Sequence, residues 1–186
     1  MTKLISLARK LLSCPFAVGS LIFLMSAISL ISALIGEHVF GLKPCILCIY
    51  QRVPFVVNLA LGLMVIGFAI NKRKIMTPLT IKISGISFLF GSIVAMYHTG
   101  VERHWWTSFL EACDVSFDNL DPATLLASIE ASAPVRCDVI PWADPILGLS
   151  MANYNAMMSL GLAIICFISA ALIKHKNQTI DAPSQA

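Results

Sequence analysis

Cys45 and Cys48, two cysteines three positions apart, are the residues best suited to chemistry in this sequence. A C-x-x-C pair can cycle between dithiol and disulfide, form half of a zinc site, or close a static disulfide. A zinc site would have to recruit Cys113 and Cys137, but these are 24 positions apart and form no second C-x-x-C. We therefore favour redox chemistry and expect no metal, with a zinc site or a structural disulfide left as alternatives.

The pair precedes a long apolar stretch that begins at about Ile49, so we expect it at the N-terminus of a helix. Free backbone N–H groups and the positive end of the helix dipole stabilise a thiolate at such a position. Arg52 follows Cys48 by four residues, on the same helical face, and adds a positive charge. These features predict that Cys48 is the thiolate.

The elements that must position these residues are membrane spans. Of 186 residues, 58% are hydrophobic and only 12% are charged, and the mean hydropathy is +0.83. Since a transmembrane helix needs about 20 apolar residues, four spans together with their connections take up most of the chain. They cover about 16–35, 49–70, 81–101 and 149–173. We predict one all-α domain over 1–186, an integral membrane four-helix bundle, because only helices satisfy their own backbone hydrogen bonds within lipid.

We interpret the first span as an uncleaved anchor, although basic residues before it also suit a signal peptide.

The positions of Lys and Arg predict the orientation, because cytoplasmic segments carry an excess of them. Nine of the thirteen lie before the first span, around the connection between the second and third, or after the fourth. Both termini should then be cytoplasmic, and the loops at about 36–48 and 102–148 should lie on the opposite side. In the longer loop, Asp121 and Pro122 favour the start of a short amphipathic helix on the membrane surface.

The six cysteines divide between the two sides of the membrane. Cys45, Cys48, Cys113 and Cys137 fall on the extracytoplasmic side, where disulfides are permitted. Cys14 and Cys166 fall at the cytoplasmic ends of the first and fourth spans, and we interpret them as packing residues.

Two polar side chains inside the spans could bind a ligand beside the cysteine pair. Arg52 lies about three residues inside the second span, and His98 about three residues before the end of the third. At about 1.5 Å per residue, both would lie about 5 Å below the same interface. A cation and an imidazole at equal depth could hold the two carbonyl oxygens of a quinone. Snorkelling of Arg52 to lipid, and an ordinary hydrogen-bonded role for His98, remain alternatives.

Several segments are similar to a known family. The run Lys43-Pro44-Cys45-Ile46-Leu47-Cys48-Ile49-Tyr50-Gln51-Arg52 closely resembles the active-site segment of the disulfide bond formation protein B family. Tyr97-His98-Thr99 resembles the end of that family's third span, and Cys113 and Cys137, followed by Trp142, resemble its second periplasmic loop. The resemblance covers about residues 21–173, and Gln51 replaces an acidic residue found in some relatives, which we interpret as tolerated variation.

The resemblance implies a thiol oxidoreductase of the bacterial inner membrane, with its active cysteines on the periplasmic side. Cys113 and Cys137 would form a disulfide that a periplasmic thioredoxin-fold dithiol oxidase (DsbA-like) attacks, and Cys45 and Cys48, also paired at rest, would reoxidise it. Two electrons would pass to ubiquinone or menaquinone, with Cys48 nearest the quinone and Arg52 and His98 around its ring. The partners would be that oxidase, membrane lipid and quinone, and no nucleic acid. A tetraspan scaffold with structural disulfides and a quinone-epoxide-reducing relative are the alternatives.

Overall fold

The structure is a computed structural model that describes residues 2–110 and 136–181, and it is all helical. Within these residues the extended backbone is limited to an isolated bridge between Ala143 and Ser150. The helices are α1 (Thr2–Leu12), α2 (Pro15–His38), α3 (Ile46–Ile70), α4 (Met76–Glu102) and α6 (Met151–Asp181). Four of them, α2, α3, α4 and α6, are long and apolar enough to cross a membrane. The prediction of an all-α bundle with four long apolar helices is therefore confirmed.

The helix ends differ from the predicted spans by a few residues, because apolar stretches do not mark where a helix stops. The sequence did not predict α1, a short amphipathic helix with Arg9 and Lys10 in its last turn. Pro15 occupies the first turn of α2, where a missing N–H costs nothing, and this separates α1 from α2. The amphipathic helix predicted at Asp121 lies outside the described residues.

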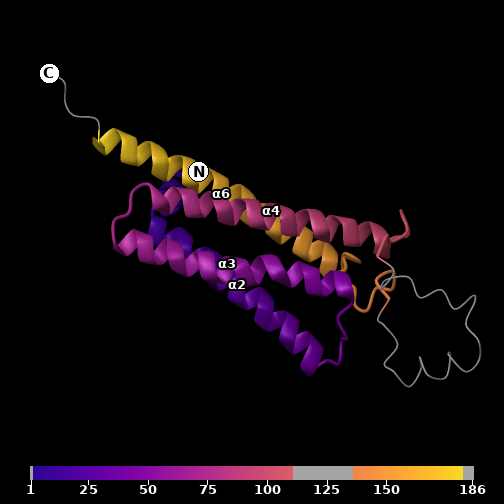
Figure 1. Ribbon diagram of the computed structural model, residues 1–186. Helices are drawn as coiled ribbons and strands as arrows, with labels where there is room; N and C mark the ends of the chain where they lie inside the picture. The colour runs from indigo at the N-terminus through magenta and orange to yellow at the C-terminus, as the bar shows by residue number, and fades with distance from the viewer. Residues whose placement is uncertain (1, 111–135, 182–186) are drawn as a thin grey trace, which may run out of the picture.

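The long helices pack side by side in an elongated bundle (Figure 1). Helix α3 lies between α2 and α4, and α4 packs against α6. Phe55 of α3 and Phe88 of α4 meet edge to face in the core, with ring centroids 5.9 Å apart. Helices α2 and α3 approach most closely at Gly62, where a Cβ atom would lie 2.9 Å from the backbone nitrogen of Phe23. Small residues at such contacts are typical of helix pairs in membranes.

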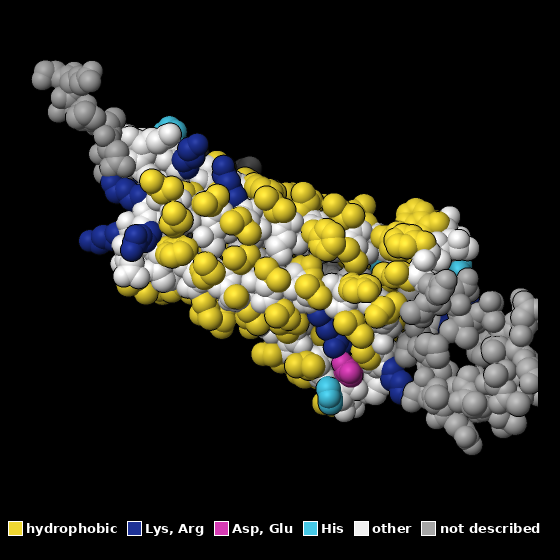
Figure 2. All heavy atoms as spheres, in the orientation of Figure 1, with side chains coloured by type: hydrophobic (Ala, Val, Ile, Leu, Met, Phe, Trp, Pro, Cys, Tyr) yellow, Lys and Arg dark blue, Asp and Glu magenta, His cyan; other side chains and the backbone are white. Residues whose placement is uncertain are grey.

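The outer surface of the bundle is largely apolar, as Figure 2 shows for one face. Lys and Arg side chains gather at the end that holds α1 and the α3–α4 turn, with Lys72, Arg73 and Lys74 in that turn. We call this the basic end. The opposite end, where α3 begins at Cys45 and α4 finishes at Glu102, is called the cysteine end.

Candidate functional site

The cysteine pair lies at the N-terminus of α3, as the sequence predicted. Cys45 is the N-cap residue, with extended backbone angles (φ −75°, ψ 170°), and its Sγ accepts a hydrogen bond from the backbone N–H of Cys48 at 3.3 Å. Both cysteines are free thiols with their Sγ atoms 2.8 Å apart, longer than the roughly 2.05 Å of a disulfide. The structure thus shows the reduced pair, whereas the resemblance implied a resting disulfide.

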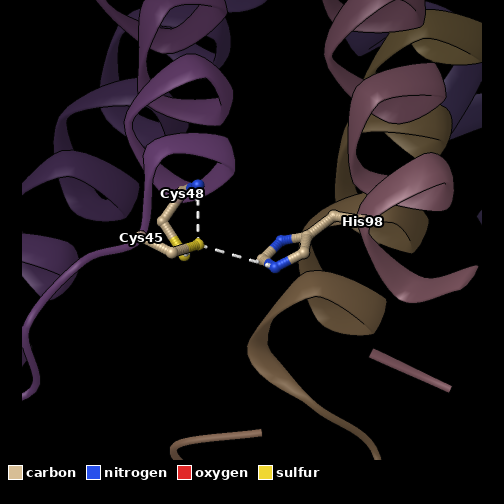
Figure 3. A group of neighbouring side chains, drawn as sticks. All are labelled: Cys45, Cys48 and His98. Carbon is tan, nitrogen blue, oxygen red and sulfur yellow. Dashed lines mark hydrogen bonds between the residues drawn. The ribbon is translucent and has the colours of Figure 1, made fainter. Parts of the chain in front are cut away.

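His98 extends from α4 toward this pair, as Figure 3 shows. Its Nε2 lies 3.6 Å from the Sγ of Cys45, and its ring is almost fully buried. The backbone of Cys137 is also within hydrogen-bonding reach of the ring. His98 therefore stands between the helix-cap pair and the connection that carries Cys137.

The contacts that stabilise a thiolate converge on Cys45. The Sγ of Cys48 lies within hydrogen-bonding distance of it, His98 lies beside it, and the backbone N–H of Cys48 donates to it. The Cys48 hydrogen bond is the largest of these effects, and together they outweigh burial and hold the pKa of Cys45 well below the usual thiol range. This differs from the prediction of a Cys48 thiolate, because the N-cap side chain, not that of the third helical residue, meets the free N–H groups.

Arg52 has a partner that the sequence did not indicate. Its Nη1 donates to Oε2 of Glu37 at 2.7 Å, across the contact between α3 and α2. Both side chains are partly exposed, at 25% and 31%. Glu37 therefore fixes the guanidinium near the cysteine end, and this ion pair accounts for an arginine near the start of an apolar helix.

Glu102, the last residue of α4, is a buried carboxylic acid that the sequence analysis did not single out. Its Oε1 lies 3.8 Å from Nε2 of His98, and its Oε2 accepts a hydrogen bond from the Ser150 hydroxyl. Ser150 in turn accepts from Nδ2 of Asn153 at 2.9 Å. The carboxyl group is thus held against the imidazole from the α6 side of the bundle.

Cys137 is disulfide-bonded and fully buried, and Cys113, its predicted partner, lies outside the described residues. Cys137 belongs to the same buried cluster as Cys45, Leu47 and Val101. Beside it, Arg136 and Asp138 form an ion pair whose hydrogen bond lowers the pKa of Asp138. Among the described residues, the structure therefore brings Cys137 close to the helix-cap pair.

These groups surround a cavity of about 400 Å³, within the range of small-molecule sites. Apolar side chains from α2, α3 and α6, including Ile28, Phe55 and Met158, line much of it. Its polar lining includes Cys45, Cys48, Gln51, Arg52, His98 and Glu102. The sequence-predicted candidates Arg52 and His98 thus face one cavity with the thiols.

The same thiols and His98 could in principle hold a metal ion, because their ligand atoms lie within 4.8 Å of one another. A metal would need an unprotonated Nε2 on His98. Gln51 Nε2 lies 2.8 Å from Nδ1, and when the amide donates there the single proton of a neutral ring is on Nε2. This hydrogen bond works against metal ligation.

Comparisons with known proteins identify the family of this chain. The family model described as "Disulfide bond formation protein DsbB" matches residues 17–169. The chain belongs to the DsbB family. It is thus a multi-pass membrane protein of a family of disulfide bond formation proteins.

Curated relatives of the family cover most of the chain. "Disulfide bond formation protein B" of Acinetobacter baumannii is 30% identical over 159 residues, 80% of this chain and 86% of the relative. The proteins of that name from Stutzerimonas stutzeri and Psychromonas ingrahamii are 27% and 30% identical, over 83% and 85% of this chain and 94% and 85% of theirs. No solved structure gives a significant match.

Proposed function

We propose that this protein is a protein-dithiol:quinone oxidoreductase of the bacterial inner membrane. It would accept electrons from a periplasmic thioredoxin-fold dithiol oxidase (DsbA-like) and pass them to ubiquinone or menaquinone, driving disulfide formation. The observation that carries the proposal is the convergence of a reduced C-x-x-C pair, Arg52 and His98 on one largely apolar cavity.

The first step would be an exchange at the Cys113–Cys137 disulfide. A thiolate of the partner attacks one sulfur, and the resulting mixed disulfide resolves to an oxidised partner and a reduced loop pair. The sequence favours Cys113 as the attacked sulfur by resemblance. Burial of Cys137 supports this choice, because a fully buried sulfur is poorly accessible to another protein.

The second step would move the electrons inward. The loop thiols reduce the Cys45–Cys48 disulfide, and the contacts around Cys45 favour this step because they stabilise the thiolate that it produces. Cys137 and Cys45 share a buried cluster, so these two sulfurs would need little movement to meet.

The third step needs an acceptor in the cavity. When bound, a quinone supplies a two-electron acceptor that takes up two protons. Arg52, held by Glu37, and the Nε2 side of His98 are the donors suited to its carbonyl oxygens. The apolar side chains of α2 and α6 suit an isoprenoid tail.

Turnover by purified protein in detergent tests the proposal. Reduced thioredoxin-fold oxidase and a soluble quinone are supplied, and quinone absorbance is followed for wild type, Cys48→Ala, Cys113→Ala and the control Cys166→Ala. We expect loss of turnover in the first two variants and none in the control. Full activity of Cys113→Ala would confine the chemistry to Cys45 and Cys48, and an inactive wild type would contradict the proposal.

A further inference from the structure

A continuous line of hydrogen bonds runs from α6 through α3 to His98 on α4. The Ser159 hydroxyl donates to Oδ1 of Asn155 at 3.0 Å, and Nδ2 of Asn155 donates to Oε1 of Gln51 at 2.6 Å. The Nε2 of Gln51 lies 2.8 Å from Nδ1 of His98. We call Gln51, Asn155 and Ser159 the amide relay.

The relay has a direction because an amide has one donating and one accepting end. Since the oxygen of Gln51 accepts from Asn155, its NH₂ group faces His98. Nδ1 of His98 must then accept, so the proton of the neutral ring lies on Nε2. That nitrogen faces Cys45 Sγ at 3.6 Å.

A second observation points to the same protonation. Oε1 of Glu102 lies 3.8 Å from the same Nε2, and neither a carboxylate nor a thiolate favours a bare nitrogen lone pair beside it. Gln51, His98 and Ser159 are buried, so water does not readily replace the relay's hydrogen bonds.

We propose that Gln51 and Asn155 are positioning residues that hold His98 as the Nε2–H tautomer, with its proton directed at Cys45 and the cavity. This makes Gln51 a determinant of the site and not the tolerated variation that the sequence suggested. The consequence for turnover rests on the proposed function, whereas the tautomer itself does not.

The proton balance of the reaction indicates what the Nε2–H group of His98 would contribute to quinone reduction. Oxidation of the Cys45 thiolate and the Cys48 thiol forms an S–S bond, breaks one S–H bond, and releases two electrons and one proton. Reduction of a quinone to its quinol consumes two protons. The second proton would come from water, because a neutral imidazole that gave up its Nε2–H would be left as an anion. The Nε2–H of His98 would instead donate a hydrogen bond that stabilises the negative charge developing on a quinone oxygen.

The test uses full-length protein labelled with ¹⁵N-histidine in detergent, without quinone. The ¹⁵N shifts of ring nitrogens distinguish protonated from bare nitrogen, and His98→Gln assigns the signals among the four histidines. We expect a bare Nδ1 and a protonated Nε2 in wild type. Gln51→Glu is nearly isosteric but can only accept when ionised, so we expect it to place a proton on Nδ1. Asn155→Ala should give a mixture of tautomers, and the control Asn177→Ala, on the same helix, should leave the wild-type shifts.

A protonated Nδ1 with a bare Nε2 in wild type would overturn the proposal, and so would wild-type shifts in Asn155→Ala.

Quinone turnover is measured on the same samples. Because the loss of one hydrogen-bond donor to a developing negative charge costs about 100-fold or more, we expect a loss of turnover of that order in Gln51→Glu. Wild-type turnover in a Gln51→Glu protein with a shifted tautomer would contradict the role in turnover. An inactive wild type with the expected shifts would instead contradict the proposed function and leave the tautomer standing.

Discussion

At the scale of single residues, the chemistry depends on which sulfur carries the negative charge. The N-cap position gives Cys45 a backbone N–H donor, and Cys48 and His98 add side-chain contacts. When another thiolate attacks the Cys45–Cys48 disulfide, a sulfur stabilised in this way is a good leaving group, because a thiol of low pKa leaves faster. The helix start thereby favours the reduced pair and makes the disulfide a stronger oxidant.

The first prediction concerns the pH range of this thiolate. Because the pKa of Cys45 is lowered, its thiolate is complete above the ordinary thiol pKa of about 8.5 and persists well below it, until the pH falls through the lowered value. We expect the ultraviolet thiolate absorbance of the reduced protein to remain at about pH 6, in a background lacking Cys14 and Cys166.

Two serine variants assign the charge. Cys48→Ser keeps a hydroxyl donor beside Cys45 and should retain the absorbance at that pH, whereas Cys45→Ser should abolish it. The reverse pattern would restore the Cys48 thiolate that the sequence predicted.

The second prediction concerns the support of Glu102. Ser150→Ala removes the hydroxyl that donates to a buried carboxyl oxygen, and an unsatisfied buried group costs about 1–3 kcal/mol. We expect a lower free energy of unfolding by that amount, measured by thermal or denaturant unfolding in detergent. Thr80→Val is the control, since the hydroxyl of this buried residue bonds to its own helix at the Met76 carbonyl. Equal stability of the two variants would show that Glu102 does not depend on Ser150.

The sequence predicted only part of the site at this scale. Cys45, Cys48 and Arg52 share one helix start, so spacing alone brings them together, and depth in the span related His98 to them. Glu102 lies one turn after His98 on α4, an i, i+4 spacing that could have indicated it. Glu37, Gln51 and Asn155 pair across the contacts of α3 with α2, α4 and α6. Their pairing depends on how each helix is rotated about its axis. A span that is apolar on all sides has no distinct polar face in its sequence, so the sequence does not indicate that rotation.

At the scale of elements, helix contacts and not hydropathy decide the geometry of the site. Apolar length identified four spans because each backbone must satisfy itself in lipid. The same criterion missed α1, which is short and amphipathic, and placed the start of α3 after the cysteine pair's own helical turn. Close contact of α2 with α3 brings Glu37 to Arg52.

The third prediction tests that contact with two glycines of α3. A Cβ at Gly62 would lie 2.9 Å from the backbone of Phe23, whereas one at Gly67 would meet nothing within 4 Å. Gly62→Ala should destabilise the protein by about 1–3 kcal/mol, as overpacking does. Gly67→Ala should be neutral or stabilise by up to about 1 kcal/mol through helix propensity. Unfolding in detergent measures both, and equal effects would mean that α2 and α3 do not pack closely at Gly62.

The fourth prediction concerns the ion pair between α2 and α3. Glu37→Ala releases the guanidinium of Arg52, which the proposed function assigns to quinone binding. A partly exposed ion pair contributes about 1 kcal/mol or less, so we expect the KM for quinone to rise up to about fivefold with kcat retained. The double variant Glu37→Arg, Arg52→Glu restores an ion pair but not a cation at position 52. Recovery of the wild-type KM in this variant would show that the pair has only a structural role.

At the scale of the whole molecule, the two ends of the bundle differ in both charge and chemistry. The basic end gathers Lys and Arg around α1 and the α3–α4 turn, and the cysteine end gathers the thiols, His98 and the cavity. Since Lys and Arg concentrate on the cytoplasmic side, this separation predicts that the cysteine end faces the periplasm, where an oxidising environment maintains disulfides.

The fifth prediction tests this orientation with two cysteines outside the site. Cys14 lies between α1 and α2 and is exposed, whereas Cys166 of α6 is fully buried. In a background where Cys45, Cys48, Cys113 and Cys137 are serine, a membrane-impermeant maleimide should label Cys14 in inverted inner-membrane vesicles but not in spheroplasts. Cys166 should remain unlabelled in both until detergent and denaturant expose it. Labelling of Cys14 in spheroplasts would place the basic end outside, and the loop disulfide would then face the reducing cytoplasm, where a relay that begins with a periplasmic partner could not operate.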